Sequence, residues 1–146
     1  MDALKQNDVH IASSNGEVKR LVVGGEVAIG LVDTDDAEEA RASGAHVVTV
    51  YPDQDGMGTL LMPTSLVLMR GAPHADAGRR LIDCLLGPDV EQRLAEHGAH
   101  IPLRPGVPVP EGVRPAADIR AMHVDYSALA ARMREMEPWL RQWVGL

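Results

Sequence analysis

Four consecutive residues, Asp33-Thr34-Asp35-Asp36, carry the clearest chemical signal in this sequence. They directly follow the apolar run 27–32, which has the continuous pattern of a strand buried on both faces. Ligands of open parallel sheets bind beyond the carboxyl ends of the strands, so these side chains could line a ligand site. They could equally cap the next helix, because acidic side chains accept the free N–H groups of a first helical turn. Both interpretations stay open on the residues alone.

A third interpretation of the acidic run is enzymatic. Asp-x-Asp after an apolar strand is the pattern of phosphotransferases of the haloacid-dehalogenase type, with Asp33 attacking phosphorus and Mg²⁺ held beside it by Asp35. That chemistry also needs a downstream cation, usually Lys, and no Lys follows Lys19. We therefore expect that the protein is not an enzyme, and we keep a metal-dependent phosphotransferase as an alternative.

A second polar group stands at Ser14-Asn15-Gly16-Glu17. Ser followed by Glu three residues later is a capping-box pattern, so a helix should begin here. The free N–H groups at such a helix start can also hold an anion. Ser14 and Asn15 are therefore candidate ligand-binding residues beside the carboxylates.

The elements that must position these groups follow a β-α-β-α-β order over residues 1–51. Strands are expected at 9–12, 27–32 and 46–51, with helices that begin at Ser14 and Asp33. This order predicts an α/β fold with a parallel sheet and flanking helices. The Pro- and Gly-containing loop 52–58 is a candidate hinge.

The rest of the chain is expected to combine helices with one further strand and an extended strap. Further elements are predicted as a strand at 65–69, helices at 75–86 and from Pro88, a proline-rich strap at 101–117, and a helical tail from Tyr126. The tail carries an apolar stripe at helical spacing, and Pro138 should kink it or split it in two.

Composition limits the classes of partner. The 146 residues are 45% hydrophobic and 24% charged, as expected for one globular domain or a piece of a larger one. A net charge of −7 disfavours nucleic acid as a partner, because an acidic chain repels phosphates. No apolar run reaches the ~20 residues that span a bilayer.

In combination, several segments resemble extracellular solute-binding proteins of the ferric-iron ABC-transporter type. The resemblance covers about residues 8–146 and rests on VAIGLVDTDDA (27–37), VYPDQ (50–54), GTLLMP (58–63), GAPH (71–74) and the helical pattern 77–91. It implies part of a type II periplasmic-binding-protein (Venus flytrap) fold, matching only the C-terminal portion of such proteins. It also implies that a small solute binds between two lobes and that an ABC permease is the partner.

The resemblance divides the chain into five parts. They are the end of the second lobe (1–51), a hinge or crossover (52–58), the closing segment of the first lobe (59–100), the strap (101–117) and the C-terminal helical tail (118–146). The implied ligand-binding residues on the cleft wall are Ser14, Asn15, Asp33, Thr34, Asp35 and Asp36. The implied hinge residues are Tyr51, Pro52, Asp53 and Gln54.

The sequence departs from the ferric-binding pattern at one place. Where those proteins have two adjacent iron-binding tyrosines, this chain has Asp35 and Asp36. Carboxylates can still hold a hard cation through oxygen, so these two residues are candidate metal ligands. No cofactor is expected, and Fe³⁺ or another hard cation would be the transported ligand.

Location and assembly complete the expectations. The resemblance implies a periplasmic or extracellular protein, although residues 1–5 lack a signal-peptide pattern, and the chain as written would stay in the cytoplasm. In the fold that the resemblance implies, the apolar segment 60–69 and the helix 75–86 pack against segments that this sequence does not contain. We therefore expect a homodimer or domain-swapped assembly, with 60–69 and the helix 129–144 at the interface. A dimeric interaction domain without a transport role remains an alternative, as does a monomer whose tail folds back.

Overall fold

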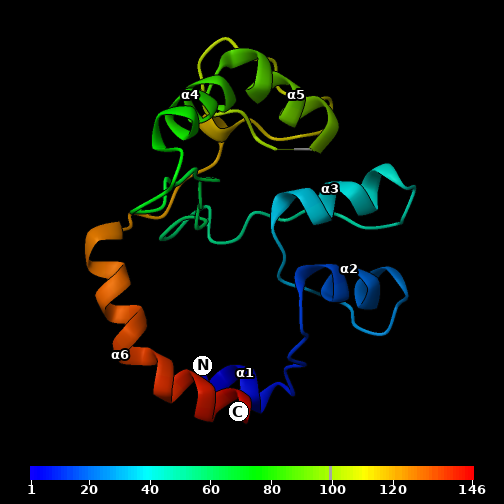
Figure 1. Ribbon diagram of the computed structural model, residues 1–146. Helices are drawn as coiled ribbons and strands as arrows, with labels where there is room; N and C mark the ends of the chain where they lie inside the picture. The colour runs from blue at the N-terminus through cyan, green and yellow to red at the C-terminus, as the bar shows by residue number, and fades with distance from the viewer. Residues whose placement is uncertain (99) are drawn as a thin grey trace.

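The chain, seen in a computed structural model, forms an open ring of helices described over residues 1–98 and 100–146. The elements are α1 (Asp2–Gln6), α2 (Asn15–Val23), α3 (Thr34–Ala42), α4 (Ala75–Leu85), α5 (Pro88–Gly98), the 3₁₀ turn η1 (Ala116–Asp118) and α6 (Tyr126–Val144). In Figure 1, α2 and α3 form one side of the ring, α4 and α5 form one end, and α6 curves along the other side until it meets α1. The two termini therefore lie next to each other.

The predicted helices form close to their expected positions. The helix after Ser14 and the helix after Asp33 are α2 and α3, and those expected at 75–86 and from Pro88 are α4 and α5. The helical tail is α6, which continues through Pro138 instead of splitting there and changes direction along its length in Figure 1. The short helix α1 was not predicted.

The predicted parallel sheet is wrong for the described part of the chain, which contains no strand. Residues 27–32 and 46–51 are non-helical, and each segment lies against the helix that precedes it. A Cβ on Gly30 would come within 2.9 Å of the Val22 side chain of α2, and Thr49 donates to Glu38 of α3. Strands form only when two extended segments exchange backbone hydrogen bonds, and these two segments face helices instead of each other.

The strands expected at 9–12 and 65–69 are also absent from the described chain. One isolated bridge pairs two segments that are distant in the sequence. Thr59 and Ala121 form this parallel bridge, in which Thr59 N donates to Arg120 O at 2.9 Å and Met122 N donates to Thr59 O at 2.8 Å. The bridge joins the loop after residue 52 to the segment that leads into α6. It closes the upper part of the ring in Figure 1.

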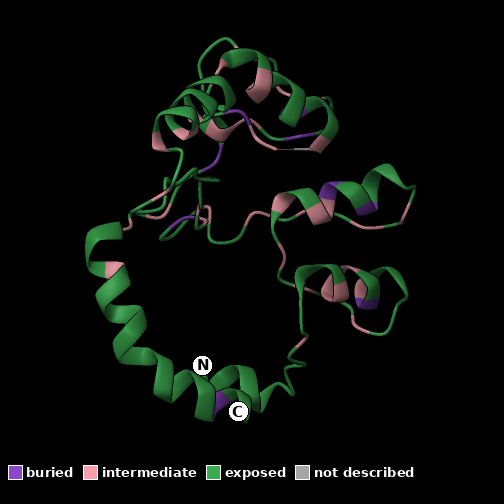
Figure 2. Ribbon diagram, in the orientation of Figure 1, coloured by how far each residue is buried: buried purple, intermediate pink, exposed green. Residues whose placement is uncertain are grey.

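Few residues of the described chain are buried, and they do not form one continuous core. The buried apolar residues of the described chain are distributed over separate contacts, as Figure 2 shows: Leu21, Ala40, Ala95, Val113, Ile119 and Trp143. The accessible surface is 11364 Å², whereas a compact monomer of 15.7 kDa exposes about 7,300 Å². The chain therefore leaves a large surface that a compact domain would cover.

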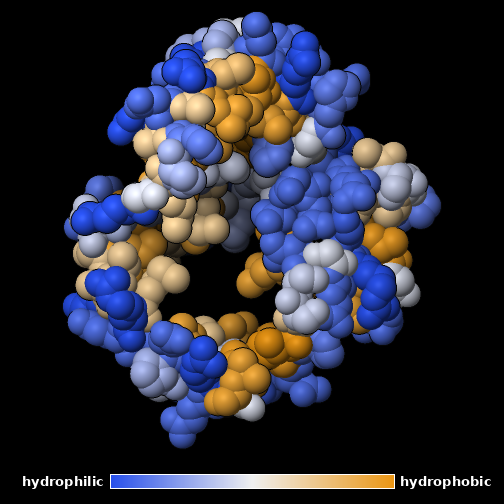
Figure 3. All heavy atoms as spheres, viewed as in Figure 1, coloured by the Kyte–Doolittle hydropathy of each residue, from blue (hydrophilic) through white to orange (hydrophobic). Residues whose placement is uncertain are grey.

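Much of this open surface is apolar. In the two extended segments, large side chains that point away from α2 and α3 are almost fully exposed, with Ile29 at 84% and Val48 at 86%. The expected exposure of the segment 60–69 is also observed, with Met62 at 74% and Val67 at 78%. Figure 3 shows apolar side chains along the lower and left rim of an opening through the molecule, whereas the right rim is mainly hydrophilic. No described helix has the length and apolar character needed to cross a membrane.

Candidate functional site

The candidate site begins at the N-terminus of α2, where the capping prediction is confirmed. Ser14 has an extended backbone, and its Oγ accepts a hydrogen bond from Glu17 N at 3.1 Å. The Glu17 carboxylate reaches back one residue further than in a standard capping box, accepting from Ser13 N at 2.6 Å and Ser13 Oγ at 2.7 Å. These bonds, the backbone one first, lower the pKa of Glu17. The neighbouring Asn15 side chain therefore remains available for another partner.

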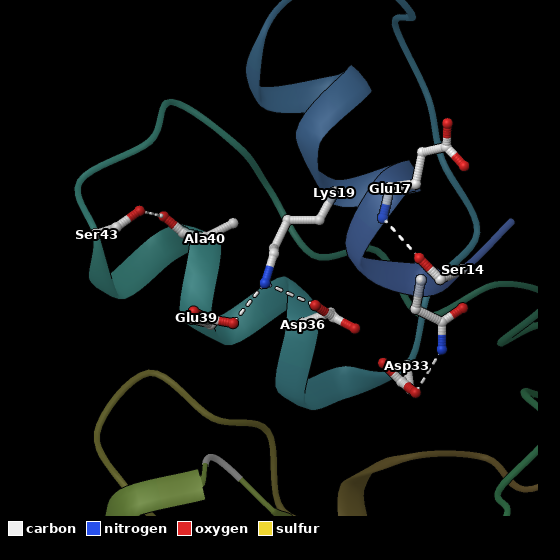
Figure 4. A network of polar contacts seen from close by, with 9 residues as sticks. Ser14, Glu17, Lys19, Asp33, Asp36, Glu39, Ala40 and Ser43 are labelled. Atoms are coloured by element: carbon white, nitrogen blue, oxygen red, sulfur yellow. Dashed lines mark hydrogen bonds and ion pairs between the residues drawn. The ribbon is translucent and has the colours of Figure 1, made fainter. Parts of the chain in front are cut away.

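That partner is Asp33, the N-cap residue of α3. Asn15 Nδ2 donates to Asp33 Oδ2 at 2.6 Å, although the two residues are 18 positions apart. The Asp33 side chain makes no capping hydrogen bond to its own helix. The capping interpretation is thus wrong for Asp33, whose carboxylate joins the starts of two helices instead (Figure 4).

The environment of Asp33 opposes its negative charge. Partial desolvation raises the pKa of this carboxyl although the residue is exposed, and the hydrogen bond with Asp35 and the charge of Asp35 raise it further. The bond from Asn15 acts in the opposite direction and lowers the pKa. Asp35 itself is exposed in the first turn of α3. Asp33 and Asp35 therefore form a carboxylate pair that a cationic group would stabilise.

Asp36 has a different role, because it is already paired within the protein. Lys19 Nζ of α2 lies 2.7 Å from Asp36 Oδ1 and also contacts the Glu39 carboxylate. Hydrogen bonds to these two carboxylates, Asp36 first, raise the pKa of Lys19. Figure 4 shows Lys19 reaching from α2 across to α3 between both acidic residues. The ion pairs hold the two helices side by side and leave little of the Asp36 charge free for a ligand.

The structure thus gathers the predicted ligand residues at two adjacent helix starts but divides them by role. The exposed N-terminal ends of α2 and α3 carry Ser14, Asn15, Asp33 and Asp35. Thr34 is half-buried in the first turn of α3, and Asp36 faces Lys19. Sequence reasoning missed Lys19. It lies four residues after Asn15, one helical turn away, and that spacing could have placed both on the same face of α2.

A metal site finds no support in the described residues. No group of three or more His, Cys, Asp or Glu side chains there is arranged to hold a metal ion. Asp36, one of the two predicted metal ligands, forms an ion pair with Lys19. The site is better suited to an ammonium group facing carboxylates and to an anion facing the start of α2.

The buried carboxylate of Glu38 links α3 to neighbouring segments. Glu38 is only 4% exposed, and its Oε2 accepts from Arg41 Nε at 2.6 Å while its Oε1 accepts from Thr49 Oγ1 at 3.2 Å. Arg41 also donates to Glu111 O at 3.2 Å. Since a buried charge must be paired, this cluster holds α3 against the segments on both of its flanks.

The predicted hinge residues lie in one tightly bonded loop. Asp53 has a left-handed backbone, with φ 56°, and its Oδ2 accepts from Met57 N at 2.7 Å. Gln54 Nε2 donates to Thr59 Oγ1 at 2.8 Å, and Gln54 Oε1 accepts from Arg120 N at 2.9 Å. Gln54 therefore ties this loop to the segment before α6.

The two remaining hinge residues flank that tie. The Pro52 carbonyl oxygen accepts from Thr59 Oγ1 at 2.7 Å. The guanidinium of Arg114 lies 5.6 Å from the centre of the Tyr51 ring, and burial raises the pKa of the Tyr51 hydroxyl. Tyr51 and Gln54 thus attach this loop to Arg114 and Arg120.

The sequence of this chain places it in a known class of protein. Residues 1–121 match the family of bacterial extracellular solute-binding proteins, and the chain belongs to that family. Its members bind solutes and are not catalytic, which confirms the expectation that the chain is not an enzyme.

Three of the proteins that the chain resembles come from Salmonella. In Salmonella typhimurium, Salmonella paratyphi A and Salmonella typhi, a protein described as 2-aminoethylphosphonate-binding and periplasmic is 28% identical over 142 residues. The match covers 96% of this chain and 39% of each relative, so the chain spans well under half of their length. No solved structure matches the chain.

Proposed function

We propose that this chain forms one wall of the solute site in the periplasmic or extracellular binding protein of an ABC importer. The observation that carries the proposal is the Asn15–Asp33 hydrogen bond, which brings the starts of α2 and α3 together. The Asp33 side chain makes no capping hydrogen bond, so it does not block the first turn of α3. Ser14, Asn15, Asp33, Thr34 and Asp35 line this wall, and Asp36 holds α3 in place through Lys19.

The solute carries an amine together with an anionic group. An ammonium ion would face Asp33 and Asp35, where two neighbouring carboxylates lack a cation. A phosphonate or similar anion would face the start of α2, where backbone N–H groups converge. The Ser14 hydroxyl can donate to it, because its oxygen already accepts from Glu17 N. The Salmonella relatives are described as binding 2-aminoethylphosphonate, which has both groups.

Two further parts of the proposal extend beyond the site. The loop of Tyr51, Pro52, Asp53 and Gln54 acts as the hinge between residues 1–51 and 59–100, and its bonds to Thr59 and Arg120 set the resting position. The closed protein then docks on an ABC permease. The hard cation expected from the sequence is a poorer fit than an ammonium group, because Asp36, one of its two expected ligands, is paired with Lys19.

Calorimetry with two matched solutes tests the proposal. We expect weak binding of 2-aminoethylphosphonate, and weaker or no binding of ethylphosphonate, which lacks the amine. The variant Asp33→Asn/Asp35→Asn should lose the difference between the two solutes. Asp55→Asn/Asp83→Asn, at two exposed acidic positions outside the site, is the control of equal charge change.

The opposite outcomes are equally clear. Equal binding of both solutes, or binding unchanged in Asp33→Asn/Asp35→Asn, would overturn the assignment of the amine to the carboxylates. A response to Fe³⁺ alone that disappears in Asp35→Ala/Asp36→Ala would favour the iron transporter. The absence of binding by any of these solutes would refute a solute site formed by this chain.

A further inference from the structure

The proline-rich strap 101–117 is attached at its start to the two helices α4 and α5. Glu91 of α5 accepts hydrogen bonds from Leu103 N at 2.7 Å, from Arg104 N at 2.9 Å and from Arg104 Nε at 3.2 Å. Arg104 Nη2 also donates to the carbonyl oxygen of Leu86, directly after α4, at 2.8 Å. Four hydrogen bonds therefore hold the start of the strap on α4 and α5.

The later part of the strap contacts α3 through Arg41. The guanidinium of Arg41 lies between two acceptors, because Nε donates to Glu38 Oε2 at 2.6 Å and Nη2 donates to Glu111 O at 3.2 Å. Glu38 is a buried residue of α3 itself, so the first bond fixes the guanidinium on that helix. A planar guanidinium can serve two acceptors at once, whereas the ammonium group of Lys is a single point charge. Arg41 therefore joins the strap to α3.

The backbone of the strap fits closely against this guanidinium at Gly112. Gly112 has a φ of 81°, and an added Cβ would lie 2.6 Å from Arg41 Nη2. The next residue, Val113, is buried. Gly106, in the same strap, has a φ of 88° with open space around it. The two glycines thus have the same backbone requirement and differ in the contact with Arg41.

Two connections therefore join α3 to α4 and α5. One is the chain itself, which leaves α3 and passes through the loop 52–58 before it reaches α4. The other is the strap, held by Arg104 on one side and by Arg41 on the other. The helix α3 has nine residues, with Asp35 in its first turn and Arg41 in its last. Because so short a helix moves as one body, a contact at its last turn also restrains the proposed solute wall at its first.

We propose that Arg41 is a positioning residue for the solute wall. By bonding to Glu38 and to Glu111 O together, it holds α3, and with it Asp33 and Asp35, in a fixed place relative to α4 and α5. The effect of Arg41 on solute binding rests on the function proposed above. Its effect on the position of α3 does not, because that effect depends only on contacts within the described chain.

Distances between two spin labels test the position of α3. The labels are attached at Ala42→Cys, the exposed last residue of α3, and at the exposed native Cys84 of α4. Gly112→Ala should broaden the distribution of distances and shift its mean, because the new Cβ displaces the Arg41 guanidinium from the strap. Gly106→Ala is the control with the same conformational cost, and it should leave the distances unaltered.

Arg41→Lys is the second variant, and it separates position from charge. A lysine keeps a cation beside the buried Glu38 but cannot also serve Glu111 O in the same geometry. The distances should therefore change in the same direction as in Gly112→Ala. Circular dichroism checks that each variant is folded, and a loss of stability by itself does not alter distances within the folded state.

Calorimetry with 2-aminoethylphosphonate then measures the effect on the solute wall, in the same proteins without labels. Gly112→Ala and Arg41→Lys should raise the Kd by about two- to tenfold, because without the bond to Glu111 O the helix α3 occupies its competent position for a smaller fraction of the time. Gly106→Ala should bind like the unchanged protein.

Three results would overturn the proposal. They are unaltered distances in both Gly112→Ala and Arg41→Lys, an equal change of distance in Gly106→Ala, and an unaltered Kd in variants whose distances do change. If the unchanged protein binds no 2-aminoethylphosphonate, the proposed function fails, and the distances alone then decide whether Arg41 holds α3 in place.

Discussion

The side-chain amide of Asn15 donates a 2.6 Å hydrogen bond to the carboxylate of Asp33, and this bond joins the first turns of two successive helices. It is the contact that turns two separate helix starts into one wall. The same bond lowers the pKa of Asp33, whereas partial desolvation and Asp35 raise it. Asn15 therefore controls both the position and the charge of this carboxylate.

Removal of the amide should raise the pKa of Asp33 further. In Asn15→Ala the carboxylate loses its donor, while partial desolvation and the neighbouring Asp35 remain. Carboxyl ¹³C chemical shifts followed through a pH titration measure the change. Asn7→Ala, in the exposed cap after α1, is the control and should leave the titration of Asp33 unaltered. A lower pKa in Asn15→Ala would contradict this account.

The raised pKa of Asp33 also predicts how stability depends on pH. A carboxyl whose pKa is higher in the folded state favours folding while it is protonated. Its contribution is present below the ordinary value of 3.8 and is lost as pH rises through the folded value. The variant Asp33→Asn keeps an acceptor for Asn15 but cannot ionise. Its free energy of unfolding, relative to the unchanged protein, should therefore increase with pH in urea titrations between pH 3 and 7. A relative stability independent of pH would show that the charge of Asp33 carries no folding cost.

Asp35 and Asp36 should differ in their effect on stability although they are adjacent. Asp36→Asn removes the partner of Lys19 and should lower Tm, because Lys19 joins α2 to α3 through Asp36 and Glu39. Asp35→Asn removes a negative charge beside Asp33 and should leave Tm unchanged or slightly higher. Calorimetric melting of both variants decides the matter. The reverse order of Tm values would refute the division of roles between these residues.

The buried Glu38 predicts a larger effect. In Arg41→Ala the Glu38 carboxylate stays buried but loses its cationic partner, which lies 2.6 Å away. We expect a loss of about 1–3 kcal/mol in the free energy of unfolding, the usual cost of an unsatisfied buried group. Arg79→Ala, which removes an exposed ion pair with Asp76 in α4, is the control and should change stability by less than about 1 kcal/mol. Equal losses in both variants would contradict the importance of burial at Glu38.

Gly58 should tolerate no side chain, because the backbone of a distant segment touches it. Its φ is 92°, and an added Cβ would lie 2.6 Å from Arg120 O. Gly71 has a similar φ of 76° with open space around it. Gly71→Ala therefore measures the conformational cost alone, about 1 kcal/mol. Gly58→Ala should cost clearly more and break the Thr59–Ala121 bridge, visible as faster amide exchange at Thr59 and Met122. Equal destabilisation by the two variants would show that the contact with Arg120 is not tight.

Local signals in the sequence determined the helices. Ser14 with Glu17, Pro88 at a first helical turn and the apolar spacing of the tail each act within one or two turns, so they set the helix bounds without help from the rest of the chain. The acidic run after Val32 likewise located the candidate wall. These interactions are short-range, and a linear pattern records them directly.

Only the tertiary structure decided which side chains pair with each other and whether the apolar runs form strands. No spacing in the sequence indicates that Asn15 bonds to Asp33, that Asp36 belongs to Lys19, or that Gln54 bonds to Arg120, because these partners are 17 to 66 positions apart. The apolar runs 27–32 and 46–51 have the composition of strands, but a strand also needs a neighbour that exchanges backbone hydrogen bonds with it. In the described chain these runs lie on α2 and α3 with their other faces open. Composition therefore located two non-helical apolar segments, and no neighbouring segment exchanges the backbone hydrogen bonds that would make them a sheet.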